Sequence, residues 1–282
     1  MGKAHRRRAR REGLLVVVGI SMVRDEADII GPVIRHMQTQ VDHLIVADNR
    51  STDGTREILE SLGVEVIDDP EIGYYQSRKM SALAQRAIEA GATWIVPFDA
   101  DEYWKAKGGP LDKVLMSLPP EALVAEAALV DHVPTGADDA TDTNPITRIG
   151  WRRTAQAPLR KVAVRAIPGV KIHQGNHSAS FPNTPHPLTV TGWLEVRHFP
   201  YRSVDQFIQK ARNGAEAYAA TNLPETAGAH WRGYGRILEE RGETACAEIF
   251  YKWFWRGDPN KTIEIEGERQ PPLVFDPCVL KS

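Results

Sequence analysis

Three carboxylates within four positions are the residues in this chain best suited to chemistry: Asp99, Asp101 and Glu102, which follow the apolar run 94–98. Carboxylate oxygens are the ligands that Mg²⁺ and Mn²⁺ prefer, and a cation that also takes diphosphate oxygens needs only one or two from the protein. Acids crowded in this way repel one another, which also favours a bound cation. The alternative is a solvated acidic turn, because the D-x-D pattern alone is short.

The elements that must position these acids come from an alternation of short β-branched runs and segments with helical periodicity, which predicts a parallel sheet covered by helices. Strands are expected at 14–22, 43–47, 64–67 and 94–98, with helices between them. Ligands of such sheets bind outside the carboxyl ends of the strands. The polar residues expected at that edge are Arg24, Asp48, Asp68 and Asp99.

The pattern is less regular beyond Trp104. One strand or a strand pair is expected at 122–133, a polar loop at 135–144, and β-rich segments at 161–167 and 188–199. Ser203 and Gln206 have the spacing of a capping box, which predicts the start of a helix. A last helix is expected from about Tyr234 to Trp255.

Three further segments precede the acids in a fixed order: 22–26 (MVRDE), 48–55 (DNRSTDGT) and Arg78. Together with 98–102 (FDADE) they resemble the signatures of family 2-type glycosyltransferases with the GT-A fold, over about residues 14–104. Two positions depart from the family pattern. Asp25 stands where an Asn is common and Asn49 where a second Asp is common, so the base of the nucleotide stays open.

The resemblance implies that Asp48, with Asn49, lies beside the nucleotide base. A carboxylate only accepts hydrogen bonds, so it suits the imide N–H of uracil. Glu26 and the backbone around Met22 and Arg24 are implied to contact the nucleoside. For Asp48 the alternative is a turn residue, and for Arg24 a surface charge.

The diphosphate is implied to lie between basic residues and a divalent cation, Mn²⁺ or Mg²⁺. Arg78 would neutralise the diphosphate or the donor sugar, and Asp99 or Asp101 would bind the cation. His198 ends a strand before the capped helix, where many GT-A enzymes have a further metal ligand; the alternative is a structural histidine. Arg202 either reaches the leaving phosphate or is an exposed basic residue.

The acceptor side has weaker signals. Gly175, Asn176 and His177 lie in a stretch expected to be flexible, which could line the acceptor pocket. A cluster of basic residues indicates an anionic acceptor or, as the favoured alternative, solvated charges at a sheet edge. Its members are Arg152, Arg153, Arg160, Lys161 and Arg165. An inverting enzyme needs a general base, and the candidates are Asp131, His177 and Glu195.

Bulk composition narrows the classes of partner. A net charge of -2 gives no general attraction for nucleic acid. The basic run 5–11 is expected to be a solvated tail, with an anionic membrane surface or RNA as the alternative.

Two cysteines exclude a disulfide framework and fit a cytoplasmic location. The apolar run 14–20 is too short for a signal peptide. The aromatic run 249–255 is expected to pack on the protein, with peripheral membrane contact as the alternative.

The predicted fold is α/β: a GT-A, Rossmann-like, doubly wound and mostly parallel sheet with an irregular acceptor-side half and C-terminal helices. The expected divisions are a basic tail (1–13), a nucleotide-sugar-binding half (14–104), an acceptor-side half (105–202), and C-terminal helices and tail (203–282). The expected activity is transfer of a hexose-like sugar from a UDP- or GDP-sugar to a glycan, lipid-linked or small-molecule acceptor, metal-dependent and inverting. The alternatives are a sugar-nucleotide-forming nucleotidyltransferase and a non-catalytic nucleotide-sugar-binding module.

Overall fold

A computed structural model describes residues 16–278. The expected basic tail at 1–13 lies outside this range. Contacts divide the described residues into two compact units. The first unit consists of 16–69, 76–129 and 157–197, and the second of 70–75, 130–156 and 198–278. No helix among residues 16–278 has the length and apolar character needed to cross a membrane.

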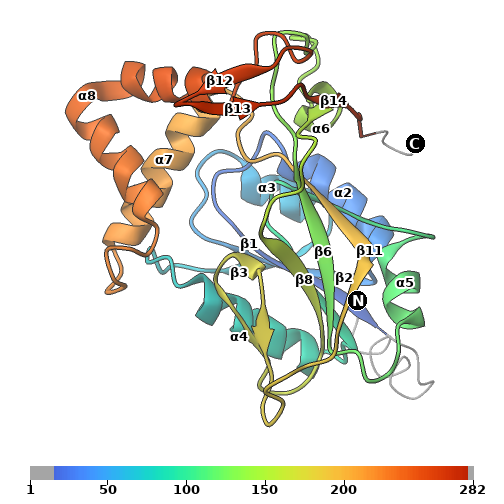
Figure 1. Cartoon of the computed structure of the whole chain (residues 1–282). Coiled ribbons are helices and arrows are strands. Elements are labelled where there is room, and N and C mark those ends of the chain that lie inside the picture. The colour runs from blue at the N-terminus through green and yellow to red at the C-terminus, as the bar shows by residue number, and fades with distance from the viewer. Residues whose placement is uncertain (1–15, 279–282) are drawn as a thin grey trace. The chain divides into compact units, whose positions relative to one another are not determined.

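Four parallel strands form half of the large sheet in the first unit (Figure 1). They are β1 (Val17–Val23), β2 (His43–Asp48), β3 (Glu65–Asp68) and β4 (Trp94–Pro97), in the order β3-β2-β1-β4. Their register pairs Val23 with Asp48 and Asp48 with Asp68, so these residues lie level at the carboxyl edge. The α/β class and the doubly wound half are therefore confirmed.

The helices between these strands are α2 (Ile30–Gln40), α3 (Thr55–Ser61) and α4 (Gln76–Glu89). Helices α2 and α4 each bury one apolar stripe at helical spacing. Met80, Leu83 and Ala84 of α4 belong to the same core cluster as Val18 and Ile20 of β1. The helix therefore lies against the central strand that leads to the candidate site.

The sheet continues beyond β4 with β8 (Arg160–Arg165), β6 (Val124–Asp131), β11 (Thr189–His198) and β5 (Glu102–Ala106), in that order. β8 is antiparallel to both β4 and β6, so the sheet is mixed. The segment expected as one strand or a pair is the single strand β6. Shorter elements complete this unit: α5 (Leu111–Ser117), β9 (Lys171–Ile172), the 3₁₀ turn η1 (Gln174–Asn176) and β10 (Ala179–Ser180).

The second unit is built around α7 (Val204–Ala219) and α8 (Ala229–Trp253), which lie side by side (Figure 1). Ser203 caps α7 as expected, since its side chain accepts a hydrogen bond from the backbone N–H of Gln206. Phe207, Phe250 and Phe254 form the aromatic contact between the helices. Phe250 and Phe254 of the aromatic run thus pack on the protein as expected, whereas Tyr251 is 55% exposed.

Short elements complete the second unit: α6 (Pro145–Arg148), β7 (Trp151–Arg152), β12 (Ile263–Ile265), β13 (Glu268–Gln270) and β14 (Val274–Phe275). Helix α8 starts earlier than the expected Tyr234 and is interrupted at Gly242, whose φ is 76°. Cys246 and Cys278 are both buried.

Candidate functional site

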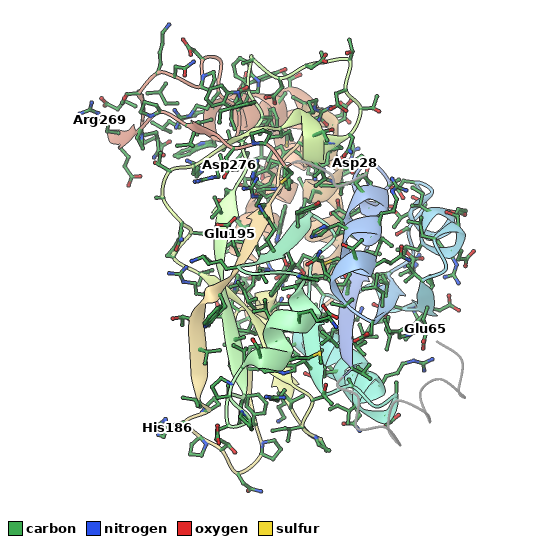
Figure 2. The ribbon with its side chains drawn as sticks, turned by 90° about the vertical axis from the view of Figure 1, so that its right-hand side faces the viewer. Asp28, Glu65, His186, Glu195, Arg269 and Asp276 are labelled. Carbon is green, nitrogen blue, oxygen red and sulfur yellow. The ribbon has the colours of Figure 1, made fainter. Side chains whose placement is uncertain are left out.

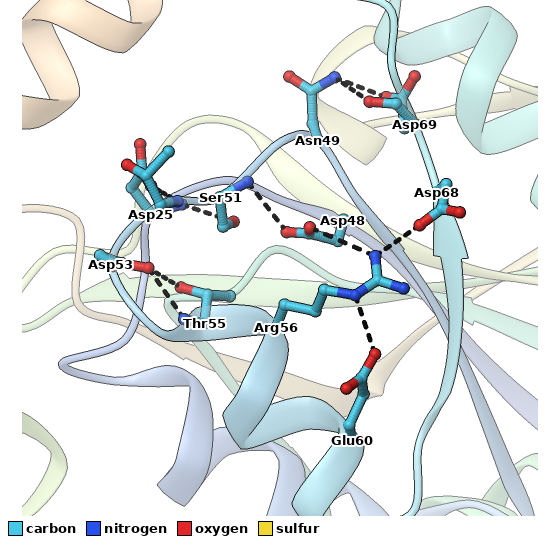
Figure 3. Close-up of polar contacts among 11 residues, drawn as sticks. Asp25, Asp48, Asn49, Ser51, Asp53, Thr55, Arg56, Glu60, Asp68 and Asp69 are labelled. Carbon is cyan, nitrogen blue, oxygen red and sulfur yellow. Dashed lines mark hydrogen bonds and ion pairs between the residues drawn. The ribbon is translucent and has the colours of Figure 1, made fainter.

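The loops after β1 and β2 hold each other through a set of short hydrogen bonds (Figure 3). The Asp25 backbone N–H donates to Ser51 Oγ (3.0 Å), and Asp25 Oδ1 accepts from the backbone N–H of Thr52 (2.7 Å). The Glu26 backbone N–H donates to Thr55 Oγ1 (2.8 Å). Asp25 has a φ of 51°, in the left-handed region that Asp and Asn tolerate best. The backbone conformation at Asp25 is thus one that Asn also tolerates.

Asp48 ends β2 and is nearly inaccessible, with 5% of its surface exposed. Its Oδ1 accepts from the Ser51 backbone N–H (3.3 Å), and Arg56 Nη1 lies 3.8 Å from its Oδ2. Arg56 also bonds Asp68 (2.5 Å) and Glu60 (2.9 Å), and the Asp68 bond is the main reason that the pKa of Arg56 is raised (Figure 3). Arg56, which the sequence did not single out, is thus a counter-charge to Asp48.

Asn49 is tied to a different acid. Its Nδ2 donates to the Asp69 carbonyl (3.1 Å) and to Asp69 Oδ2 (2.9 Å). Lys79 Nζ lies 2.7 Å from the same Oδ2 and forms an ion pair with Asp69. A carboxylate at position 49 would face that of Asp69 at hydrogen-bond distance and be repelled by it, whereas the amide of Asn49 donates to it.

The acids after β4 are neutralised from within by Lys161. Its Nζ lies 2.6 Å from Asp99 Oδ2 and 2.6 Å from Glu102 Oε1. Burial alone would lower the pKa of Lys161, but the charges of Asp99 and Glu102 outweigh that effect and raise it. The expectation that Lys161 is a solvated edge charge is therefore wrong, because this side chain is buried between two carboxylates.

The second oxygen of Asp99 is also engaged. Its Oδ1 accepts from Asn176 Nδ2 (3.0 Å) and Gln76 Nε2 (3.3 Å), while the Gly175 backbone N–H donates to Gln76 Oε1 (2.6 Å). Asn176 is fully buried. The segment expected to be flexible is instead a turn whose residues are bonded to Asp99 and, through the Gly175 carbonyl, to Lys161 (2.8 Å).

The remaining donor-side candidates lie in the same unit. Met22 lies near the carboxyl end of β1 and packs, partly buried, against the hydrophobic core. Arg24 follows that strand, with Nε 3.8 Å from Asp25 Oδ2, and Arg78 lies in the first turn of α4. Asp101 is 4% exposed. Among residues 16–278, no group of three or more His, Cys, Asp or Glu side chains is arranged to hold a metal ion.

In the second unit, His198 is paired with Asp131, since Nδ1 lies 2.8 Å from Asp131 Oδ1. A hydrogen on Nδ1 places the lone pair on Nε2, the tautomer common among metal-binding histidines. Arg202 is only 2% exposed and donates from Nη1 to the Phe199 carbonyl (3.0 Å). The alternative that Arg202 is an exposed basic residue is therefore wrong.

The other two candidate bases lie in the first unit. His177 Nδ1 is 2.7 Å from the Arg160 carbonyl. Glu195, on β11 (Figure 2), has a side chain that is 40% exposed and lies 3.5 Å from Arg197 Nε. Within the basic cluster, the guanidinium carbon of Arg165 lies 4.4 Å from the centroid of the Trp94 ring. Arg165 therefore packs against this aromatic side chain.

Comparisons with known proteins match the part of the chain that carries the sequence motifs. Residues 20–108 match the family model described as Glycosyl transferase family 2. The resemblance found in the sequence is thus confirmed over this segment. An uncharacterized glycosyltransferase of Rickettsia felis is 35% identical over 81 residues, which is 29% of this chain. The chain spans 27% of that relative's length.

Solved structures with a similar arrangement include mannosyl-3-phosphoglycerate synthase from Rubrobacter xylanophilus, at 15% identity and a TM-score of 0.38 over 97% of this chain and 90% of that one. Another is glucosyl-3-phosphoglycerate synthase from Mycobacterium tuberculosis in complex with Mn²⁺ and UDP-glucose. It is 12% identical, with a TM-score of 0.40 over 96% of this chain and 94% of that one.

Proposed function

We propose that this chain is a glycosyltransferase that moves a sugar from a nucleotide diphosphate sugar to an acceptor hydroxyl, with inversion at the anomeric carbon. The observation that carries the proposal is the set of family signatures at one sheet edge. β1 and β2 end level with each other at Val23 and Asp48, and Asp99 lies two residues beyond β4. Carboxyl edges of such sheets are where nucleotide ligands bind.

The donor roles follow from the chemistry of these residues. Asp48 accepts a hydrogen bond from the base, with Asn49 beside it. The interlocked loops hold Glu26 and the backbone around Met22 and Arg24 for the nucleoside, which makes the site rigid before the donor binds. Both a UDP-sugar and a GDP-sugar can offer the required N–H.

Arg78 and Arg202 are proposed to bind the diphosphate, because a guanidinium forms strong paired hydrogen bonds with phosphate oxygens.

The proposed cation is Mn²⁺ or Mg²⁺. Asp101 is the proposed carboxylate ligand, with His198 as a further ligand, and Asp99 would have to exchange Lys161 and Asn176 for the ion. Carboxylate oxygens and imidazole nitrogens are each acceptable ligands for such a cation, which completes its shell with diphosphate and water. Such an ion, when bound, neutralises charge on the leaving nucleoside diphosphate.

In the proposed reaction the acceptor oxygen forms a bond to the anomeric carbon as the bond to the diphosphate oxygen breaks, and a base takes the hydroxyl proton. Asp131, His177 and Glu195 remain the candidate bases. Asp131 already binds His198, so it has a second role as a positioning residue for that ring. The proposed acceptor is a glycan, a lipid-linked molecule or a small molecule. The proposed location is cytoplasmic, and no nucleic-acid partner is proposed.

The test is product analysis with the full chain, Mn²⁺ and a panel of UDP- and GDP-sugars, with donor hydrolysis as the readout when no acceptor is recognised. We expect turnover that Asp101→Asn reduces at least a hundredfold, while the exposed Asp205→Asn on α7 has no effect. Metal-independent turnover that is unchanged in Asp101→Asn would disprove the proposal. Pyrophosphate release from a nucleoside triphosphate and a sugar phosphate would favour the nucleotidyltransferase. Tight donor binding without turnover would favour the binding module.

A further inference from the structure

Arg256 follows helix α8 and is held in place by the backbone around it. Its N–H donates to the Pro134 carbonyl (3.0 Å), and its carbonyl accepts from the Gly136 N–H (2.8 Å). A Cβ at Gly136 would lie 2.4 Å from the Gly257 carbonyl oxygen, so only glycine permits this close approach of the two segments. The backbone position of Arg256 is therefore well defined.

The side chain of Arg256 is buried without compensation. The residue is 4% exposed, and its guanidinium forms no hydrogen bond or ion pair with any residue in the described range 16–278. Its pKa is lowered, first because burial disfavours the charged form and also because Arg153 adds a second positive charge nearby. Buried charges in proteins are nearly always paired, so an unpaired guanidinium requires an explanation.

Arg153 lacks a carboxylate as well. Its Nη1 donates to the neutral side chain of Gln270 (3.1 Å), and within residues 16–278 it forms no ion pair. The neighbouring Arg152 differs, since its Nε lies 2.8 Å from Asp276 Oδ2. Within the described range, one of these three arginines thus has an acid partner and the other two have none.

We propose that Arg153 and Arg256 form a binding site for an oxyanion, a phosphate or carboxylate group, carried by the acceptor. Two guanidiniums near each other repel until a shared anion bridges them, and their planar N–H groups match the oxygens of either anion. The Arg153 backbone N–H donates to the carbonyl of Asp131, whose side chain binds His198. The site is therefore adjacent in the second unit to a candidate base, and its assignment to the acceptor rests on the proposed glycosyl transfer.

The test uses the full chain without nucleotide or metal and measures its thermal unfolding during titration with inorganic phosphate, acetate, or chloride at matched ionic strength. We expect saturable stabilisation by phosphate or acetate and not by chloride. Arg256→Met should abolish that response and should unfold at the same or a higher temperature in anion-free buffer, because it removes an unpaired buried charge. The exposed Arg241→Gln on α8 serves as the matched control.

Arg153→Gln is a second variant that does not depend on Arg256→Met folding well. It should weaken phosphate or acetate stabilisation at least tenfold. A response that survives in both variants, or wild-type protein that responds equally to chloride, would overturn the site. The anion that stabilises more strongly identifies whether the acceptor carries phosphate or carboxylate.

Sugar transfer is then assayed separately with acceptors that do and do not carry this anion. In Arg256→Met the KM for the anionic acceptor should rise at least tenfold, with little change for a neutral one. An equal effect on both acceptors would refute the acceptor role. If phosphate binds through Arg256 but wild-type protein transfers no sugar, the anion site stands and the proposed glycosyl transfer fails.

Discussion

Lys161 changes what the acids after β4 can do. Its ammonium group bonds one oxygen of Asp99 and one of Glu102, at 2.6 Å each. Two of the three carboxylates in the sequence motif, Asp99 and Glu102, are therefore paired with the positive charge of Lys161. The D-x-D pattern is therefore asymmetric in this chain, with Asp99 bound to the protein and Asp101 proposed for the metal.

The first prediction concerns this buried pair. Lys161→Met should lower the free energy of unfolding by about 3–5 kcal/mol, because it leaves Asp99 and Glu102 buried without a counter-ion. Urea unfolding at neutral pH measures the change. Lys171→Met, at an exposed position on β9, should alter stability by less than about 0.5 kcal/mol. A loss as small as that of the control would show that Lys161 does not compensate these acids.

The second prediction separates Asp99 from Asp101. Asp101→Asn should weaken Mn²⁺ binding in the presence of a nucleoside diphosphate by at least tenfold, whereas Asp99→Asn should mainly reduce stability, because Asp99 holds Lys161 and Asn176. Electron paramagnetic resonance of free Mn²⁺ reports the binding directly. Equal losses of affinity in the two variants would mean that both carboxylates ligate.

At the scale of single residues, the sequence revealed the groups that belong to dense motifs. Asp48 and Asp99 follow recognisable strands, so their position at the sheet edge could be predicted. The role of Lys161 could not be predicted, because it is 62 positions from Asp99 in the sequence. It lies on β8, and no local sequence pattern specifies that β8 pairs with β4. Arg256 was missed because the absence of a carboxylate partner becomes visible only in three dimensions.

At the scale of elements, the loops after β1 and β2 are joined to each other by hydrogen bonds. Asp25 accepts from Thr52 while its own backbone N–H donates to Ser51. The third prediction is that Asp25→Asn keeps nucleotide affinity within about threefold, because Asn tolerates a positive φ and retains an acceptor oxygen. Asp25→Val should lose about 1–3 kcal/mol of stability and at least tenfold in affinity.

Calorimetric titration with UDP and GDP, together with thermal unfolding, measures both effects for the two variants. If Asp25→Val bound nucleotide as well as wild type, the interlocked loops would not shape the nucleotide site.

Helix α2 and strand β5 are joined by a histidine that must stay neutral. His36 Nε2 lies 2.6 Å from the Trp104 carbonyl, and the ring stacks on Tyr103 with centroids 3.5 Å apart. Burial lowers the pKa of His36 from its ordinary value of 6.5 to about 4. The unfolded chain therefore binds a proton more readily than the folded one, and the stability due to neutral His36 is present above pH 6.5 and lost as pH falls toward 4.

The fourth prediction is that between pH 7 and pH 5 wild-type protein loses roughly 2 kcal/mol more stability than His36→Asn, which has no group that titrates in this range. Urea unfolding of both proteins at the two pH values gives the difference. An identical loss in both proteins would contradict a buried neutral imidazole at this position.

At the scale of the whole molecule, the parallel half of the sheet could be predicted because each strand and helix leaves a local periodicity. The antiparallel half could not, since β8, β6 and β11 pair across long stretches of chain. Gly175 and Asn176 illustrate the difference. Their glycine-containing sequence suggested flexibility, yet their hydrogen bonds to Gln76 and Asp99, far away in sequence, form an ordered turn.

The fifth prediction assigns ligand effects to the two units. Nucleoside diphosphate should slow amide exchange in the loops 22–27 and 48–56 of the first unit, whereas inorganic phosphate should slow it around 134–136, 151–153 and 256 in the second. Hydrogen exchange with mass spectrometry resolves these segments. Protection by phosphate confined to the nucleotide loops would place its binding in the first unit and contradict the site at Arg256.

The internal cation also affects how the protein can be handled. Because Lys161 supplies a counter-charge to Asp99 and Glu102, we expect the first unit to fold without a divalent ion. A chelator should therefore silence the proposed transfer while leaving the unfolding temperature almost unchanged, and activity should return on adding Mn²⁺ without a refolding step. The protein would then be folded in the absence of metal, and the metal would bind only together with the nucleotide-sugar donor.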